Sequence, residues 1–410
     1  MRRLCYIFSR YSREPYDGKQ SQLFKVLPLL AKHFERIELL GLARSKGDLR
    51  GEKWSGLAKL EITELVFPGS YEVESLVCLC AKYVWIPWPG LSAMRSWIKE
   101  RDDEETVFFF EGFPFAGLLA WPRKGQVFWG EVDSYLLRAH RLRRMGVRRG
   151  LQGWLGVVVA KYLEKMGLST AAATHVYSEL DARFLRRIHP DGKVAGIPIS
   201  CNSPSKVRDA VVRRKIPRVL VWADSSYPYL EASIRTAFQA IGAPRSGQRV
   251  DYVFLIGDNP ILRAKIAKSG WEVHARVDDL DDLIANIDFV WLPDLSGTGL
   301  KNRTLHALSQ GRCVIGTKIA WEGIPITDGK HGVVLRSTSD IHDLISNLFL
   351  SRQNLAIARA GQELILGVFS SETISSKWQQ FFENRSLTHS KPDQAISIAI
   401  TTEHPSSRIA

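Results

Sequence analysis

The segment with the clearest chemical potential is residues 297–301, Gly-Thr-Gly-Leu-Lys. An apolar run at 289–292 precedes it and a stretch with helical periodicity follows it, so the segment is predicted to join a buried strand to a helix. Glycines let a ligand approach the backbone, free N–H groups at a helix start donate to anionic oxygens, and a lysine there adds a full positive charge. The pattern favours a phosphate-binding turn. The alternative is an ordinary turn whose lysine is solvated.

A carboxylate follows a second apolar run, in the first half of the chain. Phe108, Phe109 and Phe110 lead directly into Glu111. Side chains that follow buried parallel strands face the ligand crevice of an α/β sheet, and burial raises the pKa of a carboxyl toward the range of a general base. We therefore predict Glu111 and Lys301 as the catalytic residues. A helix cap or a loop salt bridge is the alternative for Glu111.

Alternating strand and helix patterns must position these side chains. Short apolar runs alternate with amphipathic stretches such as 20–34 and 230–240, which is the arrangement that builds parallel sheets. Strands are predicted at 4–8, 37–42, 107–110, 127–129, 171–177, 219–222, 252–256, 272–275, 289–292, 314–316 and 332–335. The fold class is therefore α/β, with two doubly wound halves joined by a Pro- and Ser-containing linker.

The second half of the chain resembles a known family. Residues 297–317 read G-T-G-L-K-N-R-x-L-H-A-L-x-x-G-x-x-V-I-G-T and residues 321–324 read W-E-G-I, which resembles the donor-binding half of the group 1, or family 4, glycosyltransferases of GT-B fold. Looser matches to the family's other landmarks occur, in the same order, at 16–19, 132–134, 177–181, 219–229, 256–257 and 277–280. The resemblance spans nearly the whole chain and is strong over 289–324.

The resemblance implies two Rossmann-like, doubly wound domains that face a central cleft. We place the N-terminal acceptor-binding domain at 1–198, a linker at 199–217 and the C-terminal nucleotide-sugar-binding domain at 218–366. A helix at 367–385 is expected to cross back toward the N-terminal domain, and the polar remainder, 386–410, is expected to be disordered.

The resemblance also implies roles for single residues. Gly299, Leu300 and Lys301 would contact the donor diphosphate, and the backbone near Arg276 and Val277 would meet the base. The predicted donor-binding residues are Gly257, Arg276, Val277, Gly297, Thr298, Gly299, Leu300, Lys301, Thr304 and His306, and the predicted acceptor-binding residues are Gly18, Lys19 and Asp133.

Two of these positions depart from the family pattern. Many relatives carry two glutamates eight residues apart on this loop and helix, where this chain has Thr298 and His306. Histidine can still hydrogen-bond a ribose, although without a fixed negative charge. The alternative for His306 is a half-buried helix residue held by a neighbour.

No metal and no cofactor are predicted beyond the nucleotide-diphosphate sugar itself, which is a co-substrate. The sequence has no Asp-x-Asp motif. A lysine and a helix dipole at the diphosphate stabilise the leaving group without a metal.

The positive charge of the chain is concentrated in one segment. The formal net charge is +13, and between residues 134 and 163 the chain has no acid. Aromatic side chains among prolines lie nearby in the sequence, and such residues favour the headgroup boundary of a membrane. The predicted membrane surface comprises Trp85, Trp88, Arg141, Arg143, Arg144 and Arg148. A solvated basic helix with a tryptophan-rich core is the alternative.

The composition places the protein in the cell interior. The five cysteines form no disulfide framework or zinc motif, and no targeting or transmembrane segment is predicted. We expect a cytoplasmic protein associated peripherally with the inner face of the cell membrane.

The resemblance implies a glycosyltransferase of hexosyltransferase type, which acts with retention. Together with the charge pattern, it predicts transfer of a sugar, without metal, from a nucleotide-diphosphate donor to a membrane-presented glycan or lipid-linked acceptor in cell-surface polysaccharide biosynthesis, of lipopolysaccharide or exopolysaccharide type. One alternative is a non-catalytic GT-B partner subunit of a polysaccharide assembly complex, which His306 motivates. The other is a nucleic-acid-binding protein, which the pI near 9.5 motivates but no recognition motif supports.

Overall fold

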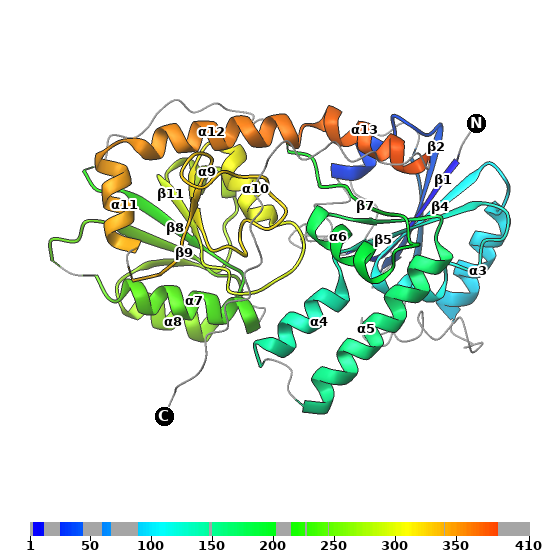
Figure 1. Cartoon of the computed structure of the whole chain (residues 1–410), viewed down its shortest axis with the longest axis horizontal. Coiled ribbons are helices and arrows are strands. Elements are labelled where there is room, and N and C mark those ends of the chain that lie inside the picture. The colour runs from blue at the N-terminus through cyan, green and yellow to red at the C-terminus, as the bar shows by residue number, and fades with distance from the viewer. Residues whose placement is uncertain are drawn as a thin grey trace.

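The computed structural model describes residues 3–11, 25–43, 60–66, 89–146, 150–201, 215–225, 228–244, 246–339 and 341–383. Within these ranges the chain forms two parallel β-sheets, each flanked by helices, and the two sheets lie at opposite ends of the long axis of the molecule (Figure 1). None of the described helices combines the length and the apolar character needed to cross a membrane.

The N-terminal sheet has the strand order β3-β2-β1-β4-β5-β6-β7, with every neighbouring pair parallel. Its strands are β1 (Arg3–Tyr11), β2 (Arg36–Ala43), β3 (Leu60–Val66), β4 (Thr106–Glu111), β5 (Gln126–Val132), β6 (Ala173–Val176) and β7 (Val194–Gly196). Its helices are α3 (Pro89–Arg101), the 3-10 helix η2 (Phe113–Gly117), α4 (Tyr135–Arg144), α5 (Gly150–Thr170) and α6 (Glu179–Ile188).

The C-terminal sheet has the order β10-β9-β8-β11-β12-β13 and is also parallel throughout. Its strands are β8 (Arg218–Trp222), β9 (Asp251–Leu255), β10 (Glu272–His274), β11 (Phe289–Leu292), β12 (Cys313–Gly316) and β13 (Val333–Val334). Its helices are α7 (Pro228–Ile241), α8 (Pro260–Lys268), α9 (Leu280–Ala285), α10 (Asn302–Ser309), α11 (Ile341–Leu350) and α12 (Gln353–Val368), and the final described helix is α13 (Ser371–Phe382).

Strand β4 shows how the N-terminal sheet buries both faces. Successive strand side chains point to opposite faces, and all six residues of β4 are buried. Phe109 packs against Trp378 and Phe382 of α13, with ring centroids 5.7 and 5.8 Å away. Phe108 and Phe110 belong to a second apolar cluster that includes residues of α3 and α5. A strand buried on both faces is expected in a doubly wound sheet.

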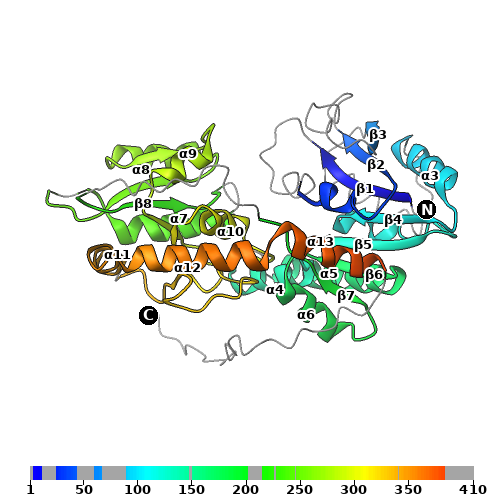
Figure 2. The same ribbon diagram turned by 90° about the horizontal axis from the view of Figure 1, so that it is seen from above.

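Helices α12 and α13 connect the two halves. Figure 2 shows α12 lying along the C-terminal half and α13 continuing across the N-terminal sheet. Ser370 caps α13, since its side chain accepts a hydrogen bond from the Thr373 amide at 3.1 Å. His33 Nε2 lies 2.8 Å from Ser375 Oγ, and Cys201 N donates to Phe369 O at 2.7 Å. Helix α13 is therefore anchored on the first half.

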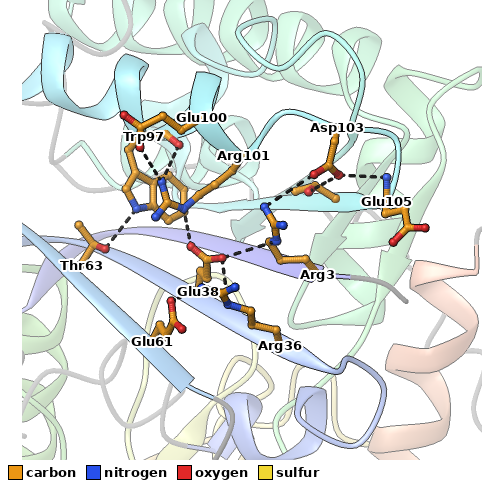
Figure 3. Close-up of polar contacts among 11 residues, drawn as sticks. Arg3, Arg36, Glu38, Glu61, Thr63, Trp97, Glu100, Arg101, Asp103 and Glu105 are labelled. Carbon is orange, nitrogen blue, oxygen red and sulfur yellow. Dashed lines mark hydrogen bonds and ion pairs between the residues drawn. The ribbon is translucent and has the colours of Figure 1, made fainter.

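A charged network lies at the amino ends of the strands of the N-terminal sheet (Figure 3). Glu38 of β2 is buried, and its carboxylate lies 3.2 Å from Arg36 Nε and 3.6 Å from Arg3 Nε, while Arg101 Nε also donates to it. The Arg101 guanidinium lies 4.4 Å from the Trp97 ring centroid. These pairs attach α3 to β1 and β2, because a buried carboxylate is stable only when it is paired.

Candidate active site

The glycine-rich loop between β11 and α10 lies at the carboxyl edge of the C-terminal sheet. Two glycines have left-handed backbone angles, with φ of 143° at Gly297 and 71° at Gly299, which other residues rarely adopt. Lys301 is only 8% exposed, and its Nζ donates to Thr298 O at 2.8 Å and to Gly299 O at 3.0 Å. The loop thus encloses a buried cation at the start of a helix, as the spacing of 297–301 predicts.

The charge on Lys301 is balanced by carboxylates from both halves of the chain. Burial lowers the pKa of this lysine, and the negative charges of Glu322, Asp294, Asp181 and Asp133 act in the opposite direction. A diphosphate brought against the loop would add further negative charge and favour the protonated amine.

Asp133 brings the N-terminal half into contact with this loop. The β5–β6 pairing is irregular between Gly130 and Val132, and Val132 has a φ of 76°, which is unusual for a β-branched residue. Such irregularities at strand ends re-aim side chains. Thr298 Oγ1 donates to the Asp133 carboxylate. A Cβ at Gly299 would lie 3.1 Å from Asp133 Cβ, so the close approach favours glycine there.

Arg141 of α4 forms a second bridge between the halves. Its guanidinium donates to both carboxylate oxygens of Glu322, at 2.6 and 2.7 Å, and also to the carbonyl of Gly297. Both side chains are largely buried, at 21% and 16% exposure. The prediction that Arg141 belongs to a membrane surface is therefore wrong, because its guanidinium forms an ion pair beside the glycine-rich loop.

Asp181, in the first turn of α6, holds the turn that follows β5. Burial, followed by the neighbouring Asp133 charge, raises the pKa of Asp181 to about 6. Hydrogen bonds oppose this effect, since Ser178 Oγ and Ser134 N both donate to the carboxylate, and the Lys301 charge opposes it too. Asp181 thus joins the turns after β5 and β6 into one edge.

Helix α10 is fixed to the turn that precedes it. Arg303 donates to both oxygens of Asp294, at 2.9 and 3.0 Å, and to Trp222 O at 3.0 Å. Thr304 is fully buried, and its hydroxyl donates to Ala320 O at 2.8 Å. The structure therefore gives Thr304 a structural role between α10 and the turn after β12, whereas the sequence placed it among the donor-binding residues.

His306 has a neighbour of its own. Its Nε2 lies 3.0 Å from Asp281 Oδ1, and its ring makes an edge contact with Trp222 at 6.1 Å between centroids. Burial lowers the pKa of His306, and the Asp281 charge opposes this. The geometry matches the alternative of a half-buried helix residue held by a neighbour.

Glu111 is held by two tyrosines. Tyr177 Oη donates to one carboxylate oxygen at 2.8 Å and Tyr6 Oη donates to the other. Burial raises the pKa of both hydroxyls, and the Glu111 charge adds to the effect. Asp133, which the sequence assigned to the acceptor, is a carboxylate that contacts the glycine-rich loop. The catalytic role of Glu111 stays a prediction.

The remaining predicted donor residues lie at strand ends of the C-terminal sheet. Gly257 follows β9 with a φ of 72°, and a Cβ there would lie 2.2 Å from Asp224 Oδ1, so glycine permits a close approach of two loops. Arg276 is exposed and Val277 is half-buried, both just after β10. Leu300 is half-buried and packs against the core.

The remaining predicted membrane-surface and acceptor-binding residues are either exposed or outside the described residues. Arg143 and Arg144 are exposed on the last turn of α4. Gly18, Lys19, Trp85, Trp88 and Arg148 lie outside the described residues, so these assignments stay predictions. In the part of the chain that is described, no group of three or more His, Cys, Asp and Glu side chains is arranged to hold a metal ion.

A pair of buried carboxyls lies beneath the start of α4. Glu164 Oε1 accepts from Ser134 Oγ at 3.0 Å and from Leu136 N at 2.8 Å. Glu131 is fully buried, and its carboxyl interacts with that of Glu164. Burial, followed by the neighbouring Glu164 charge, raises the pKa of Glu131 well above its ordinary value.

Replacing Glu131 should make stability less dependent on pH. The folded protein keeps a proton on Glu131 that the unfolded chain releases above pH about 4.5, so the wild-type free energy of unfolding falls as pH rises, by about 1.4 kcal/mol per pH unit for one such proton. Glu131→Gln removes this term, and its stability relative to wild type should increase with pH in denaturant unfolding between pH 5 and 8. Glu363→Gln, at an exposed glutamate, is the control. A difference that stays constant or shrinks with pH would contradict the assignment.

Sequence reasoning missed the contacts that join the halves. Asp294 follows a buried strand directly, a position at which polar side chains commonly serve a site, so it could have been found. The partnership of Arg141 with Glu322 spans 181 residues, and no local pattern signals it.

Comparison with known proteins agrees with this geometry. Residues 226–350 match the family described as glycosyl transferases group 1. Over this segment the chain is similar to the group 1 glycosyltransferases. That segment contains the glycine-rich loop, Lys301 and α10, so the resemblance at 297–324 is confirmed. A comparison with curated protein sequences finds no match.

Solved structures resemble this chain over nearly its whole length. Sucrose-phosphate synthase from Thermosynechococcus elongatus has a TM-score of 0.70 at 12% identity, covering 93% of this chain and 98% of that one. Anabaena HepE in complex with UDP-glucose has 0.65 at 14%, covering 92% and 99%. The pneumococcal O-GlcNAc transferase GtfA in complex with UDP and GlcNAc has 0.64 at 9%, covering 93% and 98%. These likenesses show the GT-B fold and confirm the predicted fold class.

Proposed function

We propose that this glycosyltransferase transfers a sugar from a nucleotide-diphosphate donor bound at the carboxyl edges of the two sheets. The observation that carries the proposal is the buried Lys301 at the start of α10, enclosed by the glycine-rich loop and faced by Asp133 of the other half. A fixed cation and a helix start stabilise the diphosphate more as it leaves, when its charge grows, than in the bound donor.

The family match supports the donor class. Two of the similar structures were solved with UDP-glucose or with UDP and GlcNAc, which makes a uridine-diphosphate sugar the first donor to test. We propose retention of the anomeric configuration, which the group 1 resemblance implies. The anomeric signal of the product, followed by nuclear magnetic resonance, tests this directly.

Donor binding can be measured before any acceptor is known. A donor present at 100 times its dissociation constant should raise the free energy of unfolding by about 2.7 kcal/mol. We expect one class among UDP-, GDP-, ADP- and dTDP-sugars to raise the melting temperature and to release nucleoside diphosphate slowly. A panel with no stabilisation and no release would contradict the proposal and favour a non-catalytic role.

We also propose that no metal ion takes part. Lys301 and the amide groups at the start of α10 supply the positive charge that a metal would otherwise bring to the diphosphate. Turnover should therefore stay within about twofold when EDTA is added. Loss of turnover in EDTA that Mg²⁺ or Mn²⁺ restores would contradict this proposal.

The acceptor is proposed to be presented by a membrane. The basic segment around α4 and α5 suits an anionic surface, so we propose a glycan or lipid-linked acceptor of cell-surface polysaccharide biosynthesis and a cytoplasmic location at the inner face of the cell membrane. Transfer of radiolabelled sugar into a membrane fraction, with none into the aqueous fraction, is the expected result.

A further inference from the structure

The first half of α5 exposes a continuous row of apolar side chains. Trp154, Val159 and Tyr162 are about half exposed, at 50%, 51% and 54%, and Leu151 is 71% exposed. We call the exposed set the α5 ridge, and its members are Leu151, Trp154, Leu155, Val158, Val159 and Tyr162. At 100° per residue these six positions fall within an arc of about 140°, on one face of the helix.

The other face of α5 packs on the N-terminal sheet. Leu163 and Met166 are buried, and a Cβ at Gly167 would lie 2.2 Å from the Trp129 ring, so the second half of the helix lies tight against β5. The first half extends past the sheet beside α4, at the lower edge of the N-terminal half in Figure 1. The ridge is therefore held rigidly on a protruding helix.

The surround of the ridge is basic. Arg143 and Arg144 of α4 and Lys161 and Lys165 of α5 are all exposed. Between residues 134 and 178 the sequence contains a single acid, Glu164, and that side chain is buried. No acidic side chain of this segment therefore offsets the cations.

This combination selects one kind of partner. A symmetric contact with a second copy would bring two like-charged rims together, which is unfavourable. Anionic lipid headgroups complement the cations, and the boundary below them accepts Trp, Tyr and aliphatic side chains from a helix lying in the membrane plane.

We propose that the α5 ridge and its basic surround dock on an anionic lipid surface. The ridge inserts at the headgroup boundary, and Arg143, Arg144, Lys161 and Lys165 contact lipid phosphates. This inference deepens the proposed function and rests on it, because it names the surface through which the enzyme would reach a membrane-presented acceptor. The proposed surface does not include Arg141, because that side chain pairs with Glu322 of the other half.

Co-sedimentation with vesicles tests the surface. The probes are vesicles of phosphatidylcholine alone and of phosphatidylcholine with phosphatidylglycerol. Wild-type protein should bind the anionic vesicles at least tenfold more tightly than the neutral ones, and added salt should weaken that binding. The double variant Trp154→Glu/Val158→Glu should reduce binding at least tenfold, and Arg143→Glu/Lys161→Glu should remove the preference for anionic lipid.

Matched controls separate this surface from general stickiness and from catalysis. Ile261 and Leu350 are each 78% exposed on α8 and α11, so Ile261→Glu/Leu350→Glu should leave vesicle binding unchanged. Donor-induced stabilisation, measured without vesicles, should be the same in all variants. Equal vesicle binding by the ridge variant and wild type, or a wild-type dimer that the ridge variant splits, would overturn the inference. Vesicle binding without any donor effect would support the surface while removing the proposed function.

Discussion

Lys301→Ala should lower kcat/KM for the nucleotide sugar by about 10²- to 10³-fold, the effect typical of removing one group that stabilises developing charge. The Nζ group lies at the loop carbonyls of Thr298 and Gly299 at the start of α10, where the diphosphate is proposed to bind. Its loss removes a full positive charge from a buried position, in which electrostatic interactions are strong. Initial rates of nucleoside diphosphate release measure the effect.

The pH dependence of the rate identifies the lysine as the group responsible. Burial lowers the pKa of Lys301, so the amine begins to lose its proton below the pH at which ordinary lysines do. The wild-type rate should therefore fall on the alkaline side, and this fall should be absent from the residual rate of Lys301→Ala. Lys268→Ala, at an exposed lysine at the end of α8, is the control and should match wild type. A Lys301→Ala enzyme with normal kcat/KM would refute the assignment.

Local sequence patterns predict the fold well where one element explains them. The apolar run at 289–292 coincides with β11, and the helix expected at 367–385 contains α13, whose cap Ser370 is a favoured capping residue. The sheet edges were harder to predict. Strands β3 and β7 were not predicted, although the strand expected at 332–335 contains β13. Strand β7 has only three residues, too few for alternation to be distinctive.

The residues of the site also differ in how far the sequence predicts them. Gly297, Thr298, Gly299 and Lys301 are contiguous, so their types and spacing alone predict the turn and its enclosed cation. The contacts made across the two halves depend on how the sheets face each other, which no single segment encodes. Arg141 was therefore assigned by its basic neighbours in the sequence, while the fold turns its side chain toward the other half.

The α5 ridge shows the converse limit. Hydropathy at 151–160 indicated only that the stretch is too short to span a bilayer. An apolar helix next to basic residues can be either a core helix or a helix with an exposed apolar face. The sequence alone therefore does not show which side chains of α5 are buried. Only the packing of Gly167 on Trp129 fixes which face of α5 is covered.

Arg141→Ala should lower kcat/KM by about 10- to 100-fold although Arg141 is a positioning residue and belongs to the other half of the chain. The substitution leaves Glu322 without its partner and frees the carbonyl of Gly297. A 10- to 100-fold loss corresponds to about 1.4–2.8 kcal/mol of stabilisation of the bound donor and transition state. We expect the loss mainly as a raised donor KM, since the loop that holds the diphosphate becomes less ordered.

A double-mutant cycle distinguishes positioning from a general loss of stability. If Arg141 and Glu322 act through each other, Glu322→Gln should add little to Arg141→Ala, with a coupling free energy of about 1 kcal/mol or more. Arg143→Ala, measured without vesicles, is the matched control on the same helix and should keep the wild-type KM. Additive effects of the two substitutions would contradict the positioning role of Arg141. A lower kcat and a lower melting temperature with an unchanged KM would contradict it too. Because Arg141 joins α4 both to Glu322 and to the loop that encloses Lys301, these contacts would set how firmly the two halves hold the donor between them.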